Sequence, residues 1–482
     1  MSKSFFRTFL EDSGVYLIPT LLSQGVGLFL VPLYTRILSP ADYGVIDMIK
    51  TFSSIACLVV ALEISQAYGR FYVEEETISG KKTVSSTALI FTIVTFLIFL
   101  LICQIFTPTL SKVLFGQSGL DFYFRIGTIY ISMKGVTLLL QTQFRYEMKR
   151  MDYVYNAILL FSITSFFSLF LAYFNNWGLR GMVLALLIGQ FASMSFGIWK
   201  QRLSNNLKIS KIKLKEMLRF SAPLVPSGIA IFLAAYISRI MINYYLSLTE
   251  VGLYGIGFRF ASIVILLIAG VNRSLSPLIY NHYKEKDTPR QIAKTFRLFI
   301  VFSLVFFYGI TAFAPELLRL LTTPDYYASH SIIIYLVPAL LLSQMYIFGP
   351  GLGIAKKTKI IMLISIGNAI LTISLNWIFI RLYGYEGAAI ATLISFFCVF
   401  IVKMYMSQKY YYIPFKWLNI IIASIIVTFI TVLATLINIG LMKTLIIKII
   451  IGGALFIVFY VTRLIKREEF INLFVLSKKY FQ

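Results

Sequence analysis

Histidine, cysteine and acidic side chains are scarce in this sequence of 482 residues. It contains two His, three Cys, and 20 Asp and Glu against 44 Lys and Arg. Cys57, Cys103 and Cys398 lie in apolar runs without paired spacing, which is typical of small buried residues. Only 13% of the residues are charged, and no polar stretch is long enough for a soluble nucleic-acid-binding module. We therefore expect no metal site, no cofactor and no nucleic-acid partner.

Apolar residues make up 59% of the chain, well above the share found in soluble domains. Runs of about 20 apolar residues recur along the chain, as transmembrane helices require. Their hydrophobicity is continuous and not alternating, which favours helices over a membrane barrel. The predicted fold class is an all-α polytopic membrane protein with about fourteen transmembrane helices. The predicted spans are 15–37, 43–69, 83–107, 120–143, 153–174, 178–199, 217–246, 253–281, 293–321, 327–350, 359–382, 385–407, 417–438 and 442–463.

The distribution of Lys and Arg predicts the orientation of these spans, because basic residues accumulate in cytoplasmic loops. With both termini in the cytoplasm, about three-quarters of the basic residues fall in the termini and cytoplasmic connections. We assign Lys448 to an outer connection. Once basic residues near span ends are counted with the connections, the four that remain within spans are Lys134, Arg239, Arg259 and Arg273. Most of the net charge of +24 therefore reports topology and says nothing about a ligand.

An internal repeat divides the chain into two similar halves. Gly178 and Gly181 align with Gly384 and Gly387, and Asp42-Tyr43-Gly44 aligns with Glu250-Val251-Gly252 at nearly the same offset. An even number of helices separates the aligned positions, so the halves share one orientation and form parallel lobes. The predicted organisation is an N-lobe at 1–199, a basic cytoplasmic linker at 200–219, a C-lobe at 220–409, and helices 13–14 with a cytoplasmic tail at 410–482. Two such lobes are typical of transporters that rock around a central cleft.

Ionisable and amide side chains within the spans are the candidate functional residues, because placing them in a bilayer is costly without a partner or a hydrated cavity. Several share helix faces, such as Lys134 with Gln141 and Arg145. The residues predicted to line a cationic substrate cavity are Gln24, Gln66, Arg70, Lys134, Gln141, Arg145, Arg239, Arg259, Asn272 and Arg273. A hydrated cationic cavity suits a substrate that carries phosphate or carboxylate groups.

Glu63 has two interpretations. It lies seven residues before Arg70 on one predicted helix face and could pair with it, which is the reading we favour. Alternatively, Glu63 is the protonatable site of an ion-coupled cycle, with Asp47 as the one other deep carboxylate.

Three segments carry a resemblance to a known family: LLSQGVGLFLVPLYTRILSPADYGVIDM, LKEMLRFSAPLVPSGIAIFLAAYISRIMINYYLSLTEVGLYGIGFRFA and YGYEGAAIATLIS. They resemble the lipid-linked oligosaccharide flippases of the polysaccharide transporter family, within the multidrug/oligosaccharidyl-lipid/polysaccharide (MOP) exporter superfamily. The resemblance implies a bacterial inner-membrane flippase that moves an undecaprenyl-pyrophosphate-linked repeat unit for O-antigen, capsule or exopolysaccharide assembly. The family often has Asp-Arg where this chain has Ser238-Arg239. A salt-bridged role for Arg239 in that local pair is therefore in doubt.

The resemblance implies a transporter and not an enzyme. Its implied partners are the lipid-linked oligosaccharide, membrane lipids, H⁺ or Na⁺ as the coupling ion, and a polysaccharide polymerase with a chain-length regulator. Two alternatives stay open. A membrane polymerase or ligase of the same pathway would need a large outer loop, and the outer connections here are short. A small-molecule exporter of organic cations would need an acidic lumen.

Overall fold

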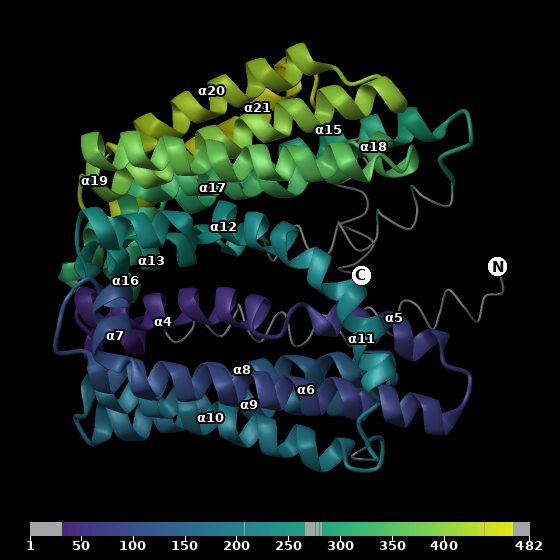
Figure 1. Cartoon of the computed structure of the whole chain (residues 1–482). Coiled ribbons are helices and arrows are strands. Elements are labelled where there is room, and N and C mark those ends of the chain that lie inside the picture. The colour runs from purple at the N-terminus through teal and green to yellow at the C-terminus, as the bar shows by residue number, and fades with distance from the viewer. Residues whose placement is uncertain are drawn as a thin grey trace, which may run out of the picture. The chain divides into compact units, whose positions relative to one another are not determined.

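The computed structural model describes residues 31–465, apart from 207, 438 and the stretch 266–281, of which Leu275 and Ile279 are described. All regular structure in these residues is helical (Figure 1). The chain forms two compact units. The first contains the described residues up to Gly255 together with Ser365–Ala388, and the second contains Ile256–Ile364 and the described residues from Ala389 onward. The helical secondary structure of the described residues confirms the all-α prediction.

The helices of the first unit precede those of the second along most of the chain. They are α3 (Val31–Ile37), α4 (Pro40–Val59), α5 (Ile64–Glu74), α6 (Ile78–Ile105), α7 (Thr107–Phe115), α8 (Asp121–Tyr146), α9 (Arg150–Phe167), the π-helix η2 (Ser168–Phe174), α10 (Gly178–Gln201), α11 (Lys211–Ser221), η3 (Ala222–Leu224) and α12 (Val225–Tyr245). Two helices contribute to both units, α13 (Leu248–Ala261) and α19 (Thr358–Tyr410). The second unit adds α15 (Thr288–Ala312), α16 (Ala314–Leu321), η4 (Pro324–Ser329), α17 (His330–Met345), η5 (Tyr346–Phe348), α18 (Gly351–Ile354), α20 (Trp417–Thr435) and α21 (Leu441–Val461).

Among the described residues, ten helices are long and apolar enough to cross a membrane, or eleven if the bent pair α4 and α5 is one span. The predicted span 120–143 corresponds to α8, which is not among them. The spans 359–382 and 385–407 both lie in α19. Most of span 15–37 and part of span 253–281 lie outside the described residues. The chain is a multi-pass membrane protein, and the number fourteen stays a prediction.

Helix α19 contains a break that separates two predicted spans. Its 53 residues would extend about 80 Å as a straight helix, more than twice the thickness of a hydrocarbon core. Gly384 interrupts it with φ 62° and ψ −144°, a conformation that glycine adopts without steric cost. The aligned Gly178 of the first half also has a positive φ, 51°. Equivalent positions of the repeat thus share an unusual backbone conformation.

A second pair of aligned glycines brings two helices into backbone contact. An added Cβ at Gly44 on α4 would lie 2.0 Å from the carbonyl oxygen of Leu248, at the start of α13. An added Cβ at Gly252 on α13 would lie 1.9 Å from the carbonyl oxygen of Pro40. Pro40 and Leu248 are separated by the same offset as the two glycines, so the two contacts are equivalent under the repeat. This reciprocal crossing, Gly44 on Leu248 and Gly252 on Pro40, is the pattern that a two-fold axis generates.

Buried polar contacts hold the last helix of the second unit. The Lys448 side chain on α21 is fully buried, and its Nζ donates to Glu316 Oε1 and to the carbonyl of Ala312, each at 2.7 Å. The hydroxyl of Tyr308 donates to the backbone carbonyl of Lys448 at 2.6 Å. The assignment of Lys448 to an exposed outer connection is therefore wrong, because the carboxylate of Glu316 provides the partner that a buried ammonium needs.

Candidate functional site

An ion pair joins α4 to α12 in the first unit. Nε of Arg239 donates to Oδ2 of Asp47 at 2.6 Å, and the Arg239 side chain is buried while that of Asp47 is nearly so. The guanidinium carbon lies 5.4 Å from the ring centre of Tyr236 and 5.5 Å from that of Tyr254. Arg239 therefore has a carboxylate partner 192 residues away in the sequence, although its neighbour Ser238 cannot supply one. The pairing gives a buried guanidinium both charge compensation and aromatic contact.

Lys134 on α8 has a different environment. Its Nζ donates to Oγ of the buried Ser53 on α4 at 2.7 Å and lies 5.8 Å from the ring centre of Tyr130. Tyr236 of α12 is close enough to interact electrostatically with both Lys134 and Arg239. In the described part of the chain, no carboxylate pairs with Lys134. Its positive charge is therefore available to a ligand, whereas that of Arg239 is already compensated.

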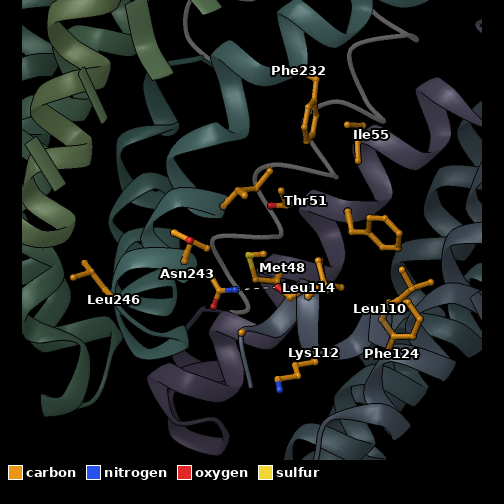
Figure 2. Close-up of a pocket in the computed structure, with 15 residues that line it drawn as sticks. Met48, Thr51, Ile55, Leu110, Lys112, Leu114, Phe124, Phe232, Asn243 and Leu246 are labelled. Atoms are coloured by element: carbon orange, nitrogen blue, oxygen red, sulfur yellow. Dashed lines mark hydrogen bonds between the residues drawn. The ribbon is translucent and has the colours of Figure 1, made fainter. Parts of the chain in front are cut away.

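A cavity of about 670 Å³ lies between α4, α7, α8 and α12 (Figure 2). Its wall is mainly aliphatic and aromatic, and its polar lining residues include Thr51, Lys112 and Asn243. Nδ2 of Asn243 donates to the carbonyl of Leu114 at 2.9 Å, which fixes α7 against α12 (Figure 2). Sequence reasoning missed this cavity, because most of its lining residues look like ordinary apolar helix positions. None of the predicted cavity cations that the structure describes lines it.

Two predicted residues line a second cavity of about 310 Å³ in the first unit. Gln66 on α5 and Arg145 on α8 share its wall with Thr142, whose Oγ1 accepts a hydrogen bond from Arg145 Nη2 at 3.0 Å. Gln141 instead donates to Asn156 Oδ1 at 2.9 Å, which joins α8 to α9. The common helix face predicted for Lys134, Gln141 and Arg145 thus does not lead to one common site.

The favoured pairing of Glu63 with Arg70 is wrong. Arg70 Nε lies 2.8 Å from Glu74 Oε1, four residues away on the same helix. A separation of seven residues corresponds to about 10.5 Å along the axis, too far for direct contact. Glu63 also lies at a break in the helix, with φ 53°, where α4 and α5 meet at 45°. Its Oε1 lies 3.1 Å from where a Cβ of Gly228 would be, so the carboxylate faces the first turn of α12.

The remaining predicted residues are placed less completely. Arg259 lies on α13 in the second unit and is partly buried, and its backbone carbonyl accepts a hydrogen bond from Ser262 Oγ at 2.7 Å. Gln24, Asn272 and Arg273 lie outside the described residues. Their assignment to the cationic cavity stays a prediction.

Residues 33–331 match the sequence profile of a family described as "Polysaccharide biosynthesis protein". The chain belongs to this family. The match covers more than half of the sequence, including α4, α8 and α12 with the Asp47–Arg239 pair and Lys134. The resemblance read from the three sequence segments is thereby confirmed at the level of the family.

Two relatives of this polysaccharide biosynthesis protein have curated names. One is "Lsg locus putative protein 1" of Haemophilus influenzae, 27% identical over 301 residues that cover 60% of this chain and 70% of the relative. Another is "Probable low-salt glycan biosynthesis flippase Agl15" of Haloferax volcanii, 24% identical over 247 residues, which cover 50% of this chain and 52% of the relative. The chain thus spans about half the length of the second relative.

Solved structures share the fold. A lipid II flippase MurJ in an inward closed conformation has a TM-score of 0.71 and 19% identity, with 92% of this chain and 97% of that chain covered. A multidrug resistance MATE family transporter of the MOP superfamily, in an inward-facing conformation, has a TM-score of 0.66 and 16% identity, with 81% and 94% covered. The chain therefore has a MATE-like fold, which the lipid II flippase MurJ also has.

Proposed function

We propose that the protein is a flippase that moves a lipid-linked oligosaccharide across the membrane for polysaccharide biosynthesis. Membership of the polysaccharide biosynthesis family supports this proposal, as do the flippase named among its relatives and the fold shared with a lipid II flippase. The observation that carries it is the environment of Lys134. This cation lies within a long helix and contacts a hydroxyl group and an aromatic ring. Such a group suits a phosphate-bearing substrate.

Lys134 and Arg239 would act on the substrate in different ways. The ammonium of Lys134 can donate to a phosphate oxygen by giving up its bond to Ser53, at little electrostatic cost. Arg239 can bind phosphate only by sharing or leaving Asp47. A pyrophosphate bound by Lys134 and Arg239 together would therefore weaken the ion pair that joins α4 to α12.

The finer proposal is alternating access between two lobes, with an undecaprenyl-pyrophosphate-linked repeat unit of O-antigen, capsule or exopolysaccharide as the substrate. The lobes are those predicted at 1–199 and 220–409, in a bacterial inner membrane with both termini cytoplasmic. A polymerase and a chain-length regulator would act on the product.

The reciprocal glycine crossing supports a specific closed contact in this cycle. Gly44 and Gly252 lie near the starts of α4 and α13, which follow the first and seventh predicted spans. The predicted orientation places both starts at the outer face. The two backbone contacts and the nearby Asp47–Arg239 pair would close the outer side, and they would have to separate for the substrate to leave.

Glu63 is the better of the two candidate coupling carboxylates. Asp47 is compensated by Arg239, whereas Glu63 forms no ion pair with any residue in the described ranges. Glu63 also lies at the bend between α4 and α5, where protonation could change the geometry of the helix pair. We propose Glu63 as the site of coupling to H⁺ or Na⁺.

The test of the main proposal replaces Lys134 by Met, which keeps the length of the side chain and removes its charge. Loss of one charge-assisted hydrogen bond is expected to lower export by about tenfold or more. Export is measured as surface polysaccharide in a strain that lacks its own flippase, with membrane levels of the protein compared by immunoblotting. Lys443→Met, at an exposed position outside both cavities described above, is the matched control.

Wild-type export by Lys134→Met at an equal membrane level would contradict the proposal. Export of organic cations by the purified protein in vesicles, without movement of a lipid-linked oligosaccharide, would favour the small-molecule exporter instead.

A further inference from the structure

Helix α11 carries a row of exposed cations. Lys211, Lys215 and Arg219 are spaced at i, i+4 and i+8, so they rise about 6 Å per step and drift only about 40° around the helix. All three are exposed. None of them forms an ion pair with a residue in the part of the chain that the structure describes.

The apolar side chains of α11 pack against other helices of the first unit. Met217 is completely buried in a core formed with α5, α6 and α8, and Leu214, Leu218 and Phe220 pack against the same core. The remaining basic residue, Lys213, points inward and pairs with Glu75. Of the four basic side chains of α11, Lys213 is therefore neutralised by Glu75, and the other three are exposed.

The segment before α11 holds the helix in a fixed orientation. The backbone N–H of Asn206 donates to Ser86 Oγ at 2.8 Å, and that of Ser210 donates to Thr87 Oγ1 at 3.1 Å. Ser210 also caps the helix by accepting from the N–H of Lys213. The exposed row thus belongs to a rigid element with a defined direction, not to a solvated loop.

The position of α11 along the chain puts the row at the membrane surface. Helices α11, η3 and α12 run from Lys211 to Tyr245 as one candidate span of 35 residues. The 21 residues of α12 alone extend about 32 Å as a straight helix, and the hydrocarbon core is about 30 Å thick. Since α12 is the apolar part, the polar α11 extends into the headgroup region. The exposed Ile212, beside the row, can enter the edge of the acyl layer.

Several exposed or half-buried cations of the first unit have acidic partners. Arg70 pairs with Glu74, Lys149 with Glu147, and Lys200 with Asp152. The row on α11 differs because no ion pair among the described residues neutralises it, and the exposed Glu216 beside it leaves α11 with an outward charge of +2 from these four residues. The inner leaflet of a membrane supplies anionic phosphates at this depth.

We propose that Lys211, Lys215 and Arg219 form a binding surface for the phosphate headgroups of anionic phospholipids. The two ammonium groups act as point charges, and the Arg219 guanidinium can bind two phosphate oxygens at once. The surface does not rest on the proposed flippase function. It does connect lipid binding to α12, the helix that carries Arg239.

The experiment uses the full chain reconstituted into vesicles of phosphatidylcholine with or without phosphatidylglycerol. Bound phosphatidylglycerol is counted by native mass spectrometry after extraction, and its affinity is measured at rising ionic strength. The test variant is the triple substitution Lys211→Gln, Lys215→Gln and Arg219→Gln. Each neutralised cation is expected to weaken binding about fivefold, which gives a loss on the order of a hundredfold for the three.

A matched control removes the same charge elsewhere. Lys112, Arg125 and Arg180 are exposed and lie in outer connections by our topology, and their replacement by Gln should leave binding unchanged. The charge-preserving pair Lys211→Arg and Lys215→Arg, with Arg219 retained, should keep the wild-type preference for phosphatidylglycerol. An unchanged melting temperature in phosphatidylcholine alone shows that each variant is folded.

Three results would overturn the proposal. The Gln triple could retain the wild-type preference for phosphatidylglycerol, or the outer control could lose that preference equally. Alternatively, undecaprenyl phosphate could displace the bound phosphatidylglycerol one for one, which would assign the row to lipid-linked substrates.

Discussion

At the scale of single residues, the partner of a buried cation decides what the cation can do. Lys448 has Glu316 and a backbone carbonyl, so it anchors α21. Arg239 has Asp47, so it joins α4 to α12 and can release them only when the pair breaks. Lys134 has a hydroxyl and an aromatic ring, so its charge can still be used to bind a ligand. Similar ionic groups within a span therefore have different partners, and the roles proposed for Arg239 and Lys134 follow from that difference.

The Asp47–Arg239 pair makes a prediction at this scale. Asp47→Asn should destabilise the protein by about 3–5 kcal/mol, because it removes a carboxylate that pairs with a buried guanidinium. The exchanged double variant, Asp47→Arg with Arg239→Asp, should recover part of that loss. Thermal unfolding in detergent, followed by tryptophan fluorescence, measures both effects. Equal stability of Asp47→Asn and wild type would show that the pair does not form.

At the scale of helices, close backbone contact imposes the strictest demands on side-chain size. Gly44 and Gly252 have no room for a methyl group, because backbone oxygens occupy the position of a Cβ. Gly309 on α15 also lies within a helix, but an added Cβ would have no heavy atom within 4 Å. These positions differ in packing and not in helix propensity, so they can be compared directly.

Gly44→Ala and Gly252→Ala should each keep α4 and α13 apart and reduce export to a similar degree. The double variant should add little, because either methyl group already prevents the same crossing. Gly309→Ala should leave export unchanged and stabilise α15 by up to about 1 kcal/mol. Surface polysaccharide and membrane abundance are measured together for all four variants. Strictly additive effects of the two glycines would argue against one shared crossing.

At the scale of the whole molecule, the repeated sequence and the apolar runs are sufficient to predict an all-helical membrane protein. The aligned glycines could be found because each copy has the same local geometry, as Gly178 and Gly384 show. The pairing of Asp47 with Arg239 could not be found, because it joins side chains 192 residues apart and depends on how α4 and α12 pack. The break at Glu63 was also hidden, since the apolar pattern continues across it.

Energy coupling belongs to this scale because it concerns the complete transport cycle. Glu63→Gln should abolish the response of transport to an imposed H⁺ or Na⁺ gradient while substrate binding persists, since the variant keeps the side-chain shape and loses the titratable group. Vesicles that contain fluorescent lipid-linked oligosaccharide, assayed with and without each gradient, provide the measurement. An unchanged gradient response would remove Glu63 from the coupling mechanism, and Glu74→Gln at an exposed position is the matched control.

A flippase for oligosaccharides faces a problem of leakage, since a passage wide enough for sugars would also conduct protons and discharge an energised membrane. The reciprocal contacts of Gly44 and Gly252 bear directly on this problem. Where a methyl group would meet a carbonyl oxygen at 2.0 Å or less, a water molecule has no space either. The contacts of Gly44 with the backbone of Leu248 and of Gly252 with the backbone of Pro40 would thus exclude water at these two points. Gly44 and Gly252 would in this way help to preserve the ion gradient across the membrane while an oligosaccharide is bound.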